Sequence, residues 1–103
     1  MLRVPLIAFL LLLSRLASAD AIENAYFVCD VFEKTGVSTD CNVSSVNFTV
    51  DVVVEATPAE AENVCAVIVQ RMAETRRAFG GRWKLSIFAP NHAEEPIAVC
   101  ALR

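Results

Sequence analysis

Residues 57–81 read TPAEAENVCAVIVQRMAETRRAFGG, and this stretch decides the fold because it carries both the start and the stop signals of a helix. Thr57 can cap the first free amide groups, Pro58 suits the first helical position, and Glu60 completes a Ser/Thr-x-x-Glu capping box. The two glycines that end the stretch can adopt the left-handed conformation that closes a helix. We therefore predict a helix of about 22 residues between these signals.

The apolar residues of this stretch recur at three- and four-residue spacing, which places them on one helical face. The members of that face are Ala61, Val64, Cys65, Ile68, Met72 and Phe79. The residues expected to point away from it are Glu62, Asn63, Gln70, Glu74 and Arg77. A face this wide indicates a helix laid across a sheet.

Four other segments are candidate strands. Residues 46–55 and 82–89 alternate between apolar and polar side chains, while 25–32 and 97–102 are short and largely apolar on both faces. Residues 33–45 have no periodicity and collect Gly, Ser, Thr, Asp and Asn, so we expect a long loop there. The expected fold class is α+β in the order β-β-α-β-β: a four-stranded, mostly antiparallel sheet with one helix packed on one face, stapled by disulfides.

The first 19 residues have the features of a secretory signal peptide. Arg3 precedes an apolar run over residues 4–13, and residues 17–19 (Ala-Ser-Ala) offer a cleavage site. The run is shorter than the roughly 20 residues that a membrane-spanning helix needs, so no stable membrane insertion is expected after cleavage. We expect residues 1–19 to be removed and residues 20–103 to form a single small domain, secreted or periplasmic. Bacterial and eukaryotic hosts both fit.

Cleavage would leave an acidic chain. It would remove Arg3 and Arg15 from the nine basic residues, so that seven face twelve acidic ones at a formal charge of −5. Nucleic acids and anionic membranes attract positively charged surfaces, so neither is an expected partner. A chain this short buries only about 60 to 65% of its unfolded surface, which makes covalent cross-links useful.

The mature chain has four cysteines, an even number that predicts two disulfides in an oxidising compartment. They are Cys29, Cys41, Cys65 and Cys100. Of the three possible pairings we favour Cys29 with Cys41, which closes a short loop, and Cys65 with Cys100, which would tie the helix to the last strand. The chain has no C-x-x-C pair and one histidine, so neither a metal nor a cofactor is expected.

Five of the seven basic residues of the mature chain gather near the end of the helix and in the strand after it. They are Arg71, Arg76, Arg77, Arg82 and Lys84. Such a cluster could bind an acidic protein or an anionic polymer through its local field. In the alternative interpretation Arg76 and Arg77 only compensate the helix dipole, and Glu74 neutralises Arg71.

Catalytic patterns are weak. His92, Glu94 and Glu95 share a turn bounded by prolines and could accept a proton or touch a metal, although a polar hairpin tip explains them equally simply. The chain has no G-x-S-x-G elbow, and the three glycines do not form a phosphate loop. We expect no enzyme and no catalytic residues. Asn42 and Asn47 lie in N-x-Ser/Thr acceptor patterns, which matter only in a host that glycosylates them.

The function expected by elimination is that of a small, secreted or periplasmic, non-enzymatic domain that binds another envelope or extracellular component. The partner would be a protein or an anionic envelope component, recognised through the basic cluster. One alternative is a structural subunit that dimerises through Tyr26, Phe32 and Phe88, which we place on outer strand faces. Another is an enzyme that uses the His92 turn. Monomer and oligomer are both open.

Overall fold

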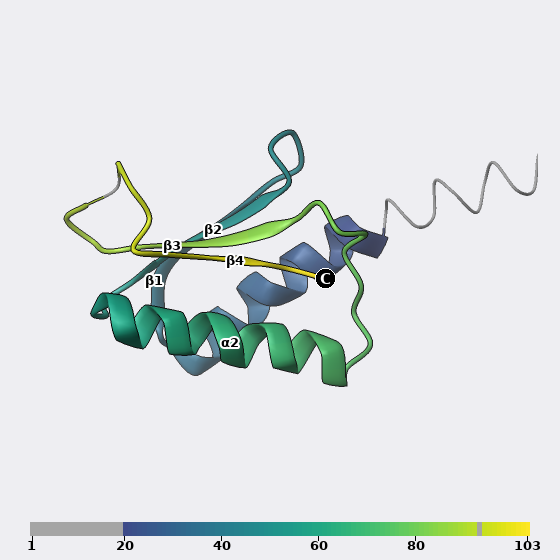
Figure 1. Cartoon of the computed structure of the whole chain (residues 1–103), viewed down its shortest axis with the longest axis horizontal. Helices are drawn as coiled ribbons and strands as arrows, with labels where there is room; N and C mark the ends of the chain where they lie inside the picture. The colour runs from purple at the N-terminus through teal and green to yellow at the C-terminus, as the bar shows by residue number, and fades with distance from the viewer. Residues whose placement is uncertain (1–19, 93) are drawn as a thin grey trace, which may run out of the picture.

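A computed structural model describes residues 20–92 and 94–103, so the expected signal peptide lies outside the described residues. A helix over residues 20–35 comes first. The elements that follow are β1 (Ser38–Ser44), β2 (Thr49–Val54), α2 (Pro58–Glu74), β3 (Lys84–Phe88) and β4 (Ala98–Ala101) (Figure 1). The α+β class is confirmed. Within the described ranges, no helix has the length and apolarity needed to cross a bilayer.

The four strands form one mixed sheet in the order β1-β2-β3-β4. The pairs β1–β2 and β3–β4 are antiparallel hairpins, whereas β2 and β3 run parallel. Helix α2 connects the two parallel strands and returns the chain to the end of the sheet where β2 began. The mostly antiparallel sheet expected from the sequence is therefore corrected to a mixed one.

The first helix is the largest departure from the sequence prediction, which placed a strand at residues 25–32 and only one helix in the fold. Its buried residues include Ala21, Ala25, Val28 and Phe32, which repeat at helical spacing. Residues 25–32 are apolar at nearly every position, so periods of 2 and 3.6 residues both fit them. The helical pattern can be distinguished from the strand pattern only when the sequence is read from Ala21 onward.

Strand β1 replaces most of the loop that the sequence predicted at residues 33–45. Gly36 ends the first helix in a left-handed conformation (φ 70°), and its N–H donates to the carbonyl of Phe32 at 3.1 Å. The chain then turns into β1, which pairs with β2 along its length. This strand is polar and lies at the sheet edge, so its own sequence gives little β signal. Pairing with β2 and the disulfide at Cys41 hold it.

Two disulfides fasten the helices to the sheet. Cys29 of the first helix is bonded to Cys41 of β1, and Cys65 of α2 is bonded to Cys100 of β4. This is the pairing that the sequence favoured. In the chain-entropy picture, loops of these lengths stabilise the fold by about 3 and about 4 kcal/mol.

Both helices cover the same face of the sheet, as Figure 1 shows. Val50, Val52 and Val54 are buried on this face of β2, beside Leu85 and Ile87 of β3. The cysteines of the sheet lie on the same face, because β1 sets its cysteine opposite Val52 and β4 sets its cysteine opposite Leu85. The opposite face of the sheet is open.

Helix α2 begins as predicted and ends earlier. Thr57 and Glu60 form the reciprocal capping box, with Pro58 in the first turn. The helix stops at Glu74, because Arg76 adopts a left-handed conformation (φ 56°) and donates its N–H to Ala73 at 3.1 Å. The next amide donates to the carbonyl of Met72 at 2.8 Å, which completes a Schellman closure. The predicted stop at the two glycines is wrong. Both are left-handed, but they lie in the loop that follows.

The predicted core face of this stretch is confirmed. Ala61, Cys65, Ile68 and Met72 are buried, and Phe79 reaches the core from the loop after the helix. Strands β2, β3 and β4 lie inside the ranges predicted for them, each one to three residues shorter at its ends.

Candidate partner-binding surface

The five basic residues of the predicted cluster lie on different parts of the fold. Arg71 is exposed on the last turn of α2, while Arg76 and Arg77 follow it and line one hollow together. Lys84 lies on the open face of the sheet, since its neighbour Leu85 points toward the helices. Arg82 lies over the ring of Phe48 at 4.3 Å, in a different hollow. The cluster divides between the helix layer, the connecting loop and the open face.

Arg77 is the most constrained of the five and is not directed away from the fold as predicted. It is half-buried, with its guanidinium carbon 3.6 Å from the centroid of the Phe27 ring. Its Nη1 donates to Asn24 Oδ1 at 3.1 Å, and Asn24 Nδ2 donates to the carbonyl of Ala78 at 2.7 Å. Asn24 itself is buried. The first helix therefore fixes the position and plane of this guanidinium.

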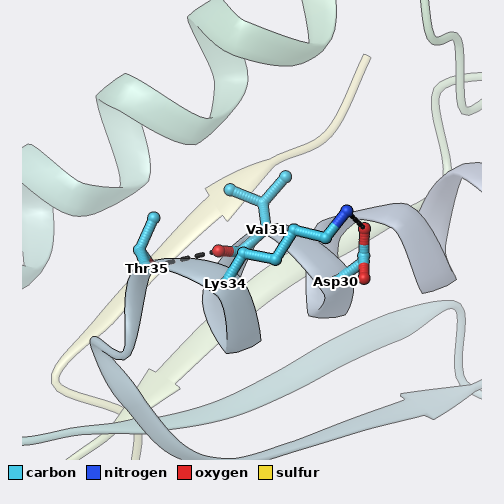
Figure 2. A network of polar contacts seen from close by, with 4 residues as sticks. All are labelled: Asp30, Val31, Lys34 and Thr35. Carbon is cyan, nitrogen blue, oxygen red and sulfur yellow. Dashed lines mark hydrogen bonds and ion pairs between the residues drawn. The ribbon is translucent and has the colours of Figure 1, made fainter.

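No carboxylate in the described part of the chain forms an ion pair with Arg77, although Asp20 and Glu23 line a hollow together with it. The one ion pair there joins Lys34 Nζ to Asp30 Oδ2 at 2.9 Å, one turn apart on the first helix (Figure 2). Figure 2 also shows the Thr35 hydroxyl donating to the carbonyl of Val31 at 3.0 Å. In addition, the Nε of Arg77 is buried and has no hydrogen-bond partner among residues 20–92 and 94–103. Arg77 thus has an unsatisfied buried Nε and a positive charge without an ion-pair partner among the described residues.

A groove of about 550 Å³ lies between one flank of α2 and strand β4, and Arg77 lines it. We call it the α2–β4 groove. Its lining residues are Ala66, Val69, Gln70, Met72, Ala73, Arg77, Cys100, Ala101 and Arg103. Two of these side chains are cations, none is acidic, and most of the others are apolar. The groove therefore combines an apolar floor with a positive charge that is partly shielded from water.

The local sequence explains why this groove forms. Ala66 and Ala73 stand seven residues apart on one flank of α2 and leave room beside the helix, while Val69 between them keeps the flank apolar. The disulfide from Cys65 to Cys100 holds α2 against β4. Helix and strand are therefore covalently held together beside the groove.

A second, mainly apolar hollow of about 250 Å³ lies between the two helices, where Val31 and Phe32 face Val64, Val67 and Ile68 of α2. Thr35 and Asn63 are the polar side chains of its lining. It has no charged side chain that would anchor an ionic ligand.

The proline-bounded turn does bring its polar residues together. His92, Glu94 and Glu95 line a hollow of about 670 Å³. The backbone N–H of His92 donates to Ala89 at 3.1 Å, which closes the turn. Among the residues that the structure places, no group of three or more His, Cys, Asp or Glu side chains could hold a metal ion. The turn places an imidazole and two carboxylates around one hollow, and no hydroxyl or thiol side chain is among its lining residues.

The aromatic residues proposed for a dimer surface do not meet. Phe32 is buried in the core, because residues 25–32 form a helix and not a strand. Tyr26 is exposed on the first helix, and Phe88 lies half-buried on β3. The apolar patch that we expected from Tyr26, Phe32 and Phe88 is therefore absent from the described structure.

Sequence reasoning missed most of the groove. It identified Arg77 as a basic residue of interest but not its contact with Phe27, which depends on the first helix being a helix. It assigned no role to Arg103 or to the alanines of α2. The seven-residue spacing of Ala66 and Ala73 was the available signal, but it gains meaning only once β4 is placed beside that flank.

Comparison of the chain with protein-family models, curated proteins and solved structures found no match in any of the three.

Proposed function

We propose that the chain is a small, secreted or periplasmic, non-enzymatic domain that binds another envelope or extracellular component at the α2–β4 groove. The observation that carries this proposal is the half-buried guanidinium of Arg77, which forms no ion pair within the described chain and lies at the edge of an apolar groove. A cation that is partly removed from water gains more from an anionic partner than one on an open surface does.

The lining of the groove also suggests the chemistry of the partner. Arg77 and Arg103 supply positive charge, Gln70 supplies a neutral polar group, and the remaining side chains favour apolar contacts. A molecule that presents a carboxylate next to an apolar group would satisfy both parts. We therefore propose a protein or another envelope component with that combination.

The side chains of this groove favour binding over catalysis. Its lining includes no hydroxyl, imidazole or carboxylate side chain, and its cysteine is held in a disulfide. Nucleophilic and acid–base catalysis need such groups. The location outside the cytoplasm rests on the two disulfides, which persist in oxidising compartments, and on the signal-like residues 1–19.

Site-specific photocrosslinking in the native host tests this proposal. A photoreactive side chain at Ala66 or Ala73 would sit in the groove, and the same side chain at Val46, which is 85% exposed in the β1–β2 turn, is the matched control. We expect one discrete adduct from the groove positions and none from Val46. The adduct should be lost when Arg77→Met is combined with Arg103→Gln. An adduct that survives this double substitution, or that forms equally from Val46, would refute the groove as the binding site.

A further inference from the structure

We infer that the partner binds the groove as an extended segment that adds a strand to β4 and presents an Asp or Glu side chain to Arg77 and Arg103. This inference rests on the proposed function of the α2–β4 groove and specifies how the partner occupies it. Its basis is the position of the groove along a free sheet edge.

Strand β4 is the last strand in the sheet order, and its outer edge has no partner within the described chain. The N–H of Leu102 donates to the carbonyl of Trp83 at 2.9 Å, so Leu102 points its backbone groups toward β3. Backbone groups alternate in direction along an antiparallel strand. Val99 and Ala101 therefore point their N–H and C=O groups outward, where an added strand could bond to them.

The α2–β4 groove runs beside this same edge. Cys100, Ala101 and Arg103 line one wall of it, and the flank of α2 lines the other. A strand added to β4 would alternate its side chains between the open face of the sheet and the groove. Strand addition beside a helix uses backbone bonds for affinity and such pockets for specificity.

The charges lie at one end of the groove. Arg77 follows the C-terminal end of α2 and Arg103 follows β4, and Figure 1 shows that α2 and β4 run in the same direction. Both guanidinium groups therefore belong to the same end, while Ala66, Val69 and Ala73 form the apolar remainder. An extended segment with one acidic and at least one apolar side chain on the same face matches this arrangement.

A second copy of the chain matches it less well. Pairing of β4 with β4 would bring together two edges whose residues 98–102 read AVCAL and include no acidic side chain. Each groove would then keep its arginines without a carboxylate. Charge complementarity thus favours a different, acidic segment over a symmetric dimer.

Selection from a phage-displayed library of random peptides, each about ten residues long, tests the inference on the purified oxidised protein. We expect the enriched peptides to contain an Asp or Glu two residues away from an apolar, β-branched residue, so that both side chains lie on the same face. Val99→Pro removes the outward N–H without removing a bond to β3, so it should weaken binding by about tenfold. Val99→Ala keeps that N–H and is the control, which should bind as the wild type does. Arg77→Met and Arg103→Gln should each weaken acidic peptides but not their Glu→Gln analogues.

The outcomes separate the two proposals. If Val99→Pro binds the enriched peptides unchanged while Arg77→Met loses them, strand addition is wrong and the groove remains the site. If both variants bind as the wild type does, the site itself is wrong. Failure to enrich any acidic peptide also overturns the inference. So does self-association that Val99→Pro abolishes, measured by sedimentation equilibrium, because the occupant of the edge would then be a second copy.

Discussion

At the scale of single residues, packing determines the environment of the Arg77 charge. On a helical wheel it belongs to the solvent side, but the helix ends before it, and the loop turns its side chain onto Phe27. Asn24 then fixes one Nη atom. A guanidinium held by an aromatic ring and an amide loses little entropy when an anion binds, because its geometry is already set.

Arg76 offers a test of the helix end. Its left-handed conformation costs an ordinary residue about 1 kcal/mol or more, a penalty that glycine avoids. We therefore expect Arg76→Gly to raise the free energy of unfolding by about 1 kcal/mol in urea denaturation. Arg71→Gly, inside the helix, is the control and should lower it by about 1 kcal/mol. Equal destabilisation by both variants would show that α2 does not close at Arg76.

At the scale of elements, the sequence predicts the helices and strands that have a local sequence pattern. It does not predict the elements that lack one. A capping box predicts where helix α2 begins. Strand β2 alternates strictly between buried and half-buried residues. The first helix was mistaken for a strand because its sequence fits both periods. Strand β1 was missed because its stability comes from neighbours distant in sequence, as is common for edge strands. The β4 edge and the α2 flank form half of the site. Their proximity depends on how the elements pair, and no local sequence pattern predicts it.

The capping box of α2 gives a pH-dependent prediction. The Thr57 backbone N–H, which donates to Glu60 Oε1, and the Thr57 side chain lower the pKa of Glu60 below its ordinary value of 4.5. A carboxyl whose pKa is lowered by folding stabilises the fold above its unfolded pKa, and this contribution is lost as the pH falls through its folded pKa. The advantage of the wild type over Glu60→Gln should therefore be constant near neutrality and shrink as the pH falls below about 4.5.

Urea unfolding of both proteins across this pH range measures the effect. Thr57→Ala, which removes the hydroxyl that caps the Glu60 amide, should cost about 1 kcal/mol at neutral pH. A difference between wild type and Glu60→Gln that grows as the pH falls would contradict the assigned sign.

At the scale of the whole molecule, the two disulfides and the single covered face define which surfaces are available. Both helices are tied to one face, so the functional surfaces are the open face, the loops and the sheet edges. Both edge strands carry a disulfide, and the edge at β1 has mostly polar side chains. The edge at β4 is short but borders an apolar groove with unpaired positive charge. The Cys65–Cys100 bond thus both stabilises the fold and holds α2 beside β4 at the groove.

Amide chemical-shift mapping is the most direct test of this groove as the binding site. The oxidised, isotope-labelled protein would be titrated with the partner segment identified by photocrosslinking. We predict the largest shifts at Val99, Ala101 and Arg77, with little change at Asp51 on the central strand β2. Shifts that centre on the His92 turn or on the open face, with the groove unchanged, would contradict it.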